Sequence, residues 1–140
     1  MEILIVAAIS TIVLSAIGTV IVSGHICYNQ ASEIVELQRD ASLAMNTISH
    51  SIQAGRAAEL ESNGQAIKIY RETDWIRYFP EYGDLKSEIE GGQPQVVVQG
   101  NLEALGFTLQ ANKVGIDLTL KKDNVQNNFV STVSMRNYGE

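Results

Sequence analysis

A chain of 140 residues with a net charge of −6 has room for one long helix and one small domain, which excludes a large two-lobed enzyme. The acidic balance gives no general attraction for phosphate groups, so we expect no nucleic-acid partner. The single cysteine, Cys27, excludes an intramolecular disulfide, and we interpret it as a small apolar residue at a helix interface.

Residues 3–26 form an apolar run that contains no Asp, Glu, Lys or Arg. As a helix with a rise of about 1.5 Å per residue, this run is about 36 Å long, which is enough to cross the hydrocarbon core of a bilayer. Glu2 lies at its start, where a carboxylate in lipid costs several kcal/mol unless a cation pairs with it. We therefore predict a membrane-spanning segment over residues 1–26 and expect a cationic partner for Glu2.

A stripe of apolar residues continues beyond this run. It recurs at steps of three and four residues, at Ile34, Leu37, Ala41, Ala44, Ile48 and Ile52. Because this is the spacing of one helix face, we predict a single helix over residues 1–54, apolar all round in its first half and amphipathic in its second. Gly55 is the predicted stop of this helix.

Small residues are interspersed along the apolar half, and small residues allow apolar helices to approach one another closely. The candidate helix-packing positions are Ala7, Ala8, Ala16, Gly18 and Gly24. The alternative is an ordinary single-span anchor in which the small residues have no such role. Each glycine weakens a helix by about 1 kcal/mol relative to alanine, so Gly18 or Gly24 could instead mark a place where the helix unwinds.

The pattern then changes to the alternation of β-strands. We predict strands over residues 66–71, 75–79, 85–89, 105–110, 114–120 and 129–135, with residues 96–98 as a strand edge or packed loop. The predicted turns are residues 59–64, 80–84, 111–113 and 121–128. The last three strands should pair as an antiparallel meander, and the amphipathic half of the helix should cover one face of the sheet. The predicted fold class is α+β, with residues 55–140 forming a small antiparallel sheet domain.

The first eighteen residues, MEILIVAAISTIVLSAIG, resemble the N-terminal segment of type IV pilins and pseudopilins. In that family a short leader ends in Gly, and the mature chain begins Phe-Thr-Leu-x-Glu before an apolar helix. Met1 then aligns with the variable position and Glu2 with the family's glutamate. On this alignment the leader and three mature residues would precede Met1, and we expect the working protein to carry them. The resemblance implies that Glu2 pairs with the N-terminal amine of an adjacent subunit.

Later segments narrow the resemblance to J-type pseudopilins of type II secretion and the related minor pilins of type IV pili. These segments are LQRDASLAMNTISHSI, WIRYFPEYGDLKSEIEGG and FVSTVSMRN. In that group the polar helix often carries an Arg-Asp pair, here Arg39 and Asp40, and the last strand commonly ends in Arg-Asn, here Arg136 and Asn137. The family's major pilins with a disulfide-closed loop carry a pair of cysteines near the C-terminus, whereas this sequence has only one cysteine.

The sequence contains no set of residues whose spacing predicts a catalytic site. His25 and His50 would lie about 37 Å apart on a continuous helix, and His25 and Cys27 would point to different helix faces. There is no Gly-rich phosphate loop and no suggestive nucleophile set, so we expect no catalytic residues, cofactor or metal site. We expect two acidic pairs to lie on solvated loops, Glu59 with Glu61 and Glu88 with Glu90.

Two further functions receive little support from the sequence. Residues 84–90 and 123–128 carry oxygen ligands that calcium could use, but neither segment has a known ligand spacing. A conductive track of stacked aromatics is not supported, because Tyr28 is the one aromatic residue of the predicted helix.

Together these observations favour a structural subunit of a type IV pilus-like or type II secretion filament, and within that class a minor pilin or pseudopilin. The open alternatives are a major pilin and a membrane-anchored binding module with a single span. The expected partners are copies of itself or other pilins. The resemblance implies two further partners, a prepilin peptidase and an assembly platform. We expect the chain in the inner membrane before assembly and in an extracellular or periplasmic filament afterwards.

Overall fold

The computed structural model describes residues 2–136, which form one long helix, a short 3₁₀ turn and eight strands. These elements are α1 (Glu2–Ala54), β1 (Ala57–Glu61), η1 (Ser62–Gly64), β2 (Ala66–Tyr70), β3 (Trp75–Glu81), β4 (Asp84–Ile89), β5 (Gln95–Val98), β6 (Leu102–Gln110), β7 (Lys113–Lys122) and β8 (Val125–Ser134). The chain divides into two compact units, Met1–Val35 and Glu36–Glu140. We call residues 2–35 the N-terminal segment and residues 36–136 the head, so that α1 contributes to both.

The predicted single helix is confirmed from Glu2 onward, and Met1 lies outside the described residues. The helix is continuous through Gly18 and Gly24, so neither glycine unwinds it. It ends before Gly55, as predicted. A Cβ built on Gly55 would lie 2.5 Å from Cγ2 of Ile69, so any side chain at this position would require Ile69 of β2 to shift.

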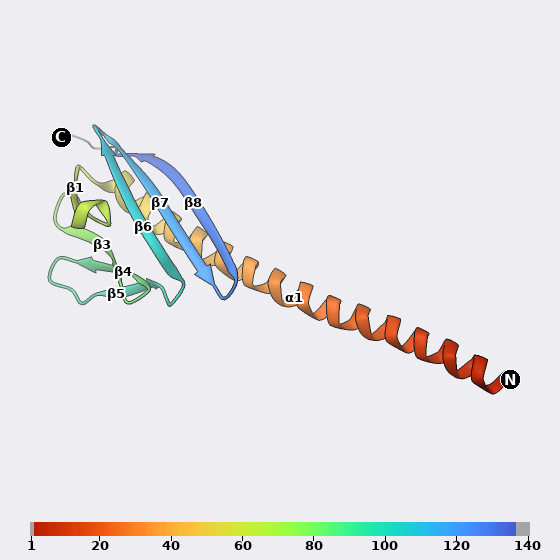
Figure 1. The fold of residues 1–140 in the computed structure, drawn as a ribbon. Helices are drawn as coiled ribbons and strands as arrows, with labels where there is room; N and C mark the ends of the chain where they lie inside the picture. Colours follow the sequence, from red (N-terminus) through yellow and green to blue (C-terminus); the bar gives the residue numbers. More distant parts are fainter. Residues whose placement is uncertain (1, 137–140) are drawn as a thin grey trace. The chain divides into compact units, whose positions relative to one another are not determined.

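The head contains two antiparallel sheets rather than one. The first has the strand order β1-β2-β3-β4-β5, and the second is the predicted meander β6-β7-β8. The sheets meet along β6, which contacts β1, β2 and β3 (Figure 1). Since every strand pairs with its sequence neighbour within its own sheet, each sheet is built from local hairpins.

One hydrophobic core joins both sheets to the second half of α1. The predicted stripe from Leu37 to Ile52 is buried at Leu37, Ala41, Ala44, Ile48 and Ile52, whereas Ile34 belongs to the N-terminal segment. The sheets contribute mainly Ile67, Ile69, Tyr78, Leu85, Phe107, Val114, Ile116, Leu118 and Leu120. The hydroxyl of Tyr78 lies 2.7 Å from Oγ of Ser51, which links β3 to the helix. The expected α+β class is confirmed.

Several predicted boundaries were wrong, because residues at the ends of strands had been assigned to turns. Strand β1 was missed because AAELE carries two glutamates and has no buried position. The turn after β3 contains Tyr82 and Gly83 alone, since Pro80 and Glu81 extend the strand. The turn between β7 and β8 is likewise restricted to residues 123–124. For residues 96–98, which were predicted as a strand edge or a packed loop, the structure shows the first alternative, the edge strand β5 (Gln95–Val98).

Candidate assembly surface

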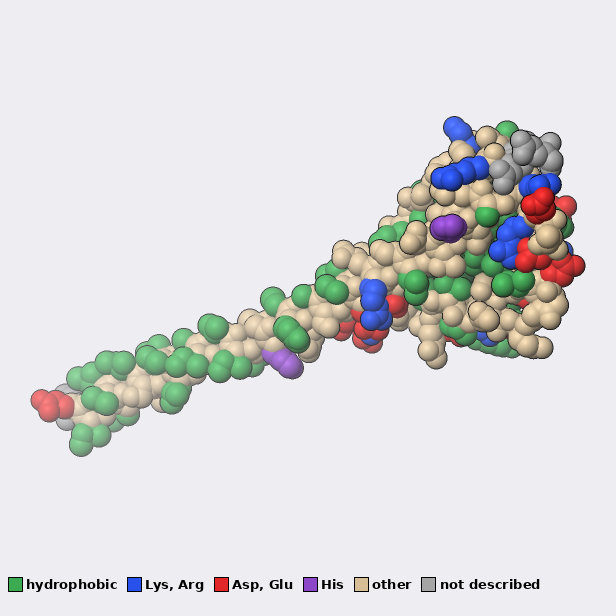
Figure 2. Space-filling model, turned by 180° about the vertical axis from the view of Figure 1, so that it is seen from behind, with side chains coloured by type: hydrophobic (Ala, Val, Ile, Leu, Met, Phe, Trp, Pro, Cys, Tyr) green, Lys and Arg blue, Asp and Glu red, His purple; other side chains and the backbone are tan. Residues whose placement is uncertain are grey.

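The N-terminal segment presents apolar side chains in every direction. All residues from Glu2 to Ser32 are exposed in the single chain, and Ile3, for example, is 86% exposed. Figure 2 shows hydrophobic side chains following one another along this part of α1. Monomeric soluble proteins rarely expose contiguous apolar patches larger than a few hundred Å². This surface therefore needs a cover from outside the chain.

Three hydroxyl side chains within the segment form hydrogen bonds to the backbone of the helix itself. The hydroxyl of Thr11 donates to the carbonyl of Ala8 at 2.8 Å, and Ser15 donates to Thr11 at 2.7 Å. Thr19 donates to the carbonyl of Ser15 at 2.6 Å. Such bonds within one helix spare these hydroxyls the cost of lacking a partner in an apolar environment.

The length and composition of α1 are sufficient for one membrane span, and an N-terminal signal sequence would meet the same criteria. The structure therefore establishes a long apolar N-terminal helix that suits either a membrane anchor or a signal.

The predicted packing positions have no role within the single chain. A Cβ built on Gly18 or Gly24 meets no atom within 4 Å, so intrachain contacts do not require glycine at either place. Ala7, Ala8 and Ala16 are exposed. Shallow hollows lie on the helix beside Ala16 and Gly24, the second bordered also by Cys27. The small residues thus leave room for a second apolar surface to approach the helix.

Glu2 is exposed, and no described residue forms a hydrogen bond or ion pair with it. A partner for its carboxylate is therefore to be sought outside residues 2–136. The expected pairing with an N-terminal amine stays a prediction.

The structure does not bring the candidate ligand residues together. His25 and His50 are separated by 25 positions of one continuous helix. Among residues 2–136, no three His, Cys, Asp or Glu side chains are grouped in a way that could hold a metal ion. Residues 84–89 form β4, and residues 125–128 lie in β8, so most of the two oxygen-rich segments adopt extended backbone instead of a ligand loop.

The acidic pairs predicted on solvated loops lie mostly in strands, which corrects that expectation. Glu59 of β1 accepts a hydrogen bond from the hydroxyl of Tyr70 at 2.8 Å, and Glu61 lies 2.6 Å from Nε of Arg77. Glu88 of β4 is 3.9 Å from the same guanidinium group. Glu59 and Glu88 therefore link neighbouring strands of the first sheet, and Glu61 reaches across β2 from β1 to β3.

A set of polar contacts joins the first turns of the head's helix to the sheets. Glu36 forms an ion pair with Lys122 at the end of β7, and the hydrogen bond from Lys122 lowers the pKa of Glu36 below its ordinary value of 4.5. Asp40 accepts a hydrogen bond from Nδ2 of Asn101 at 3.2 Å and lies 3.4 Å from Arg39. These contacts fasten the start of the head's helix to β7 and to the loop before β6.

The predicted Arg-Asn pair at the end of the last strand, Arg136 and Asn137, lies at the C-terminal limit of the described residues. The backbone N–H of Arg136 donates to the carbonyl of Gln53 at 3.4 Å. Asn137 lies outside the described residues.

Sequence reasoning missed two features of the head that the structure reveals. One is Tyr82, exposed at the tip of the β3–β4 hairpin, and the other is a groove on the outer face of the second sheet, over Gly106 and Gly115. Glycines in strand interiors can mark a close approach of another molecule, and this signal was present in the sequence.

No protein-family model, curated protein or solved structure matches this chain. Its likeness to pilins is one of architecture, in which a long apolar N-terminal helix packs its later turns on antiparallel β-sheets.

Proposed function

We propose that this protein is a structural subunit of a type IV pilus-like or type II secretion filament, held in a membrane before assembly. The observation that carries the proposal is the contrast within α1. Its first half is exposed and apolar all round, whereas its second half buries a narrow stripe under the sheets of its own head.

The same apolar surface can serve both states of such a subunit. Lipid covers it before assembly, and the helices of neighbouring subunits cover it afterwards, so the transfer leaves little apolar area in water. Gly18, Gly24 and the small residues near them permit the close approach that helix packing in a filament needs.

Glu2 supplies register in this proposal. A buried carboxylate is costly without a cation, and an adjacent subunit's N-terminal amine would be that cation. A subunit displaced along the filament would leave the carboxylate unpaired. The ion pair therefore selects one axial position among many that apolar packing alone would allow.

The test is Glu2→Ala, with Glu2→Asp as the matched variant that keeps the charge. We expect Glu2→Ala to remain in the membrane fraction but to enter sheared filaments poorly, and Glu2→Asp to retain part of the assembly. Membrane and filament fractions are compared by immunoblotting. Assembly of Glu2→Ala at the wild-type level would rule out the ion pair.

Within this class, we propose a minor pilin or J-type pseudopilin that starts or caps the filament. Electron microscopy of sheared surface filaments, with mass spectrometry of their subunits, measures how much of each filament this chain supplies. Trace amounts or a position at filament ends support the minor role. Dominance of this chain would make it a major pilin. A protein that stays monomeric and tolerates any apolar replacement in the N-terminal segment would instead be an anchored binding module.

A further inference from the structure

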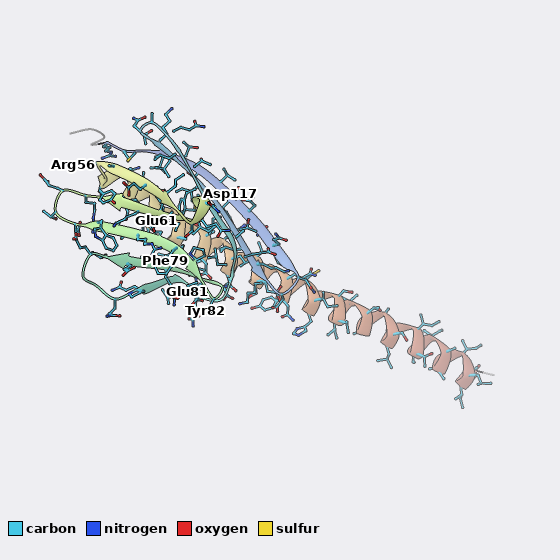
Figure 3. All side chains as sticks on the ribbon, turned by 60° about the vertical axis from the view of Figure 1, so that its left-hand side comes forward. Arg56, Glu61, Phe79, Glu81, Tyr82 and Asp117 are labelled. Atoms are coloured by element: carbon cyan, nitrogen blue, oxygen red, sulfur yellow. The ribbon has the colours of Figure 1, made fainter. Side chains whose placement is uncertain are left out.

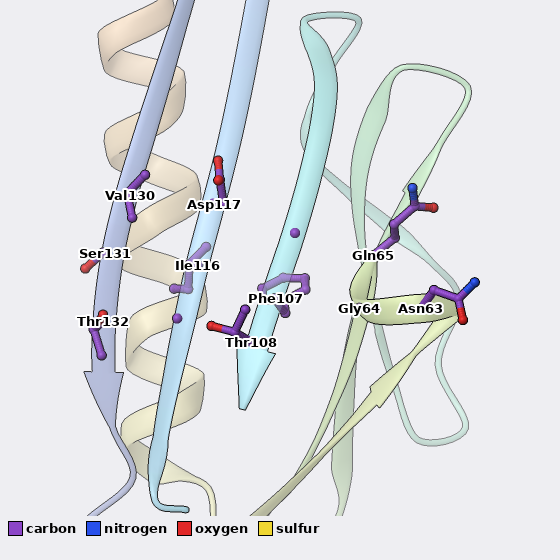
Figure 4. A pocket seen from close by; sticks show the side chains of 12 residues that line it. Asn63, Gly64, Gln65, Phe107, Thr108, Ile116, Asp117, Val130, Ser131 and Thr132 are labelled. Carbon is purple, nitrogen blue, oxygen red and sulfur yellow. The ribbon is translucent and has the colours of Figure 1, made fainter. Parts of the chain in front are cut away.

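The second sheet of the head ends in a long strand with one open edge. β8 pairs with β7 along its whole length of 10 residues without a register shift, and no strand among the described residues pairs with its other side. Figure 4 shows β8 as the outermost strand of this sheet, at the labelled residues Val130, Ser131 and Thr132. An open edge offers backbone groups with which a further strand can pair.

Two hydrogen bonds at the end of β8 show which backbone groups face the open side. The N–H of Met135 donates to the carbonyl of Asn112 beside β7, whereas the N–H of Arg136 donates to the carbonyl of Gln53 in α1. Successive N–H groups of a strand point to opposite sides, so the even-numbered residues of β8 direct their backbone groups away from β7. No described residue forms a hydrogen bond with these groups from Gln126 to Ser134. They form an unused ladder.

The other strand edges of the head carry the features with which proteins protect open edges, namely charge, short length, irregular pairing or a cover. β1 carries two glutamates, of which Glu61 is labelled in Figure 3. β5 has 4 residues and an irregular register with β4. β6 is in contact with the first sheet. Residues 125–134 of β8 contain no Asp, Glu, Lys, Arg or Pro, so its edge is open to pairing.

The surface beside this edge indicates the chemistry of its partner. Because Arg136 bonds Gln53, the helix face that carries Gln53 lies on the β8 side of α1. The same face carries Ser42, Asn46 and Ser49, at the three- and four-residue steps of a helix. Neither this face nor β8 carries a charge. A strand added here would therefore lie over small or polar side chains, and a charged side chain pointing inward would have no partner.

A second copy of this chain does not fit the open edge within a filament. Two copies could pair through the same edge only antiparallel, about a two-fold axis. β8 runs in the direction of α1, because its first residue pairs with Lys122, the partner of Glu36, and its last residues lie beside Gln53. The two N-terminal segments would then join the pair of heads at opposite ends. Subunits of one filament share one direction, which this pairing violates.

Pairing with β1 or β5 of a second copy has a different consequence. Each added copy would offer a new β8, so the contact would repeat from copy to copy. A minor subunit that starts or caps a filament needs a contact that ends with its partner.

We propose that an extended, uncharged segment of a different filament subunit adds to β8 as the fourth strand of the second sheet. Its backbone bonds the N–H and C=O groups of the even-numbered residues from Gln126 to Ser134, and it lies over the helix face from Ser42 to Gln53. Main-chain bonds of this kind give affinity, and the side chains of the added strand give specificity. This inference rests on the proposed filament function and defines the contact between two different subunits.

Photo-crosslinking in sheared filaments of the full-length protein tests the contact. p-Benzoylphenylalanine replaces Asn128, Val130 or Thr132, which are exposed on the outer face of β8, and mass spectrometry identifies the crosslinked residue. All three positions should crosslink to one segment of a different subunit. Because a paired strand has a period of two, the crosslinked residue should move by two for each step of two along β8. Crosslinks to another copy of this chain, or without this step, would overturn the inference.

A proline variant tests whether the backbone of β8 makes the contact. Asn128→Pro removes an N–H of the open side and leaves the bonds to β7 in place, so the head should keep its thermal stability. Asn128→Ala is the matched control, because it changes the same side chain and keeps the N–H. Loss of one backbone bond, with the ring in the way of the added strand, should lower the crosslink yield from position 132 about tenfold relative to the control.

The remaining outcomes separate this contact from the filament function. Equal crosslink yields of Asn128→Pro and Asn128→Ala would refute pairing through the backbone. Filaments that contain this chain but give no crosslink from β8 to another subunit would refute the contact while the filament function stands. A wild-type chain that is absent from filaments would refute both.

Discussion

The two halves of α1 share one backbone geometry but differ in what covers them. In the head, the helix buries a stripe from Leu37 to Ile52 and leaves its other faces to solvent. In the N-terminal segment, side chains such as Ile12 and Val13 are exposed on all sides. A sheet of the same chain can cover an apolar stripe, because the stripe occupies one side of the helix. It cannot cover a helix that is apolar on all sides. Its cover must come from lipid or from other chains.

The charges of the helix follow the same division. Between Glu2 and Glu33 the sequence contains no Asp, Glu, Lys or Arg. The later turns carry Glu36, Arg39 and Asp40, and two of these side chains contact the sheets through Lys122 and Asn101. The charged residues of the helix are thus Glu2 at its start and those from Glu33 onward, at the border with the head and within it.

The largest difference between the halves should appear when the same residue type is truncated in each. Ile48 is fully buried and Ile12 is 69% exposed. Ile48→Ala should lower the free energy of unfolding of the head by about 2–5 kcal/mol, through lost apolar burial and the cavity left behind. Ile12→Ala should leave head unfolding unchanged. Chemical denaturation of the full chain in micelles, followed by Trp75 fluorescence, measures both.

Equal destabilisation of the head by the two variants would contradict the division of α1. It would mean that the N-terminal segment contributes to the folded core.

A lysine substitution should also affect membrane partitioning differently in the two halves of α1. Val13 and Leu43 have similar exposure, at 50% and 57%. A lysine at the centre of a membrane span costs about 2.5–3.5 kcal/mol, which corresponds to more than about 50-fold in partitioning. Val13→Lys should therefore move protein out of the membrane fraction, whereas Leu43→Lys lies on the solvated side of the head's helix and should not. Carbonate extraction of membranes reports the partitioning.

Retention of Val13→Lys at the wild-type level would argue that the N-terminal segment does not span a bilayer. A loss of Leu43→Lys equal to that of Val13→Lys would point to general misfolding instead.

Hydrophobic periodicity was sufficient to predict the helix and six strands, since those segments bury one face. Residues 114–120 alternate strictly, and β7 indeed buries Val114, Ile116, Leu118 and Leu120. Strand β1 could not be found in this way because none of its side chains is buried, and its pairing with β2 depends on the backbone. The start of β8 was hidden for a similar reason, because Gln126 and Asn128 point to solvent.

The candidate assembly surface was more accessible to sequence reasoning than the groove. An apolar run with Glu2 at its start is local in sequence, so its meaning does not depend on the fold. The groove needs η1 placed beside β6 and two glycines on adjacent strands, Gly106 opposite Asp117 and Gly115 opposite Thr108. That placement follows from a register that the sequence does not specify locally. Tyr82 was read as part of a turn, but its exposure depends on how far β3 and β4 extend.

The smallest expected effect is on the pH dependence of the free energy of unfolding of the head, and it arises at the border between the two halves of α1. The hydrogen bond and charge of Lys122 lower the pKa of Glu36 in the folded head, so this ion pair stabilises the head above the ordinary pKa of 4.5. The stabilisation is lost as the pH falls from about that value through the lowered pKa of the folded state. Glu36→Gln should flatten this part of the profile of unfolding free energy against pH.

Glu33→Gln is the matched control, because no described residue forms an ion pair with Glu33 three positions earlier. An equal flattening by both variants would show that the acid sensitivity comes from the helix as a whole. An effect of Glu36→Gln alone would place the border of the head at the first side chain of α1 that pairs with a strand.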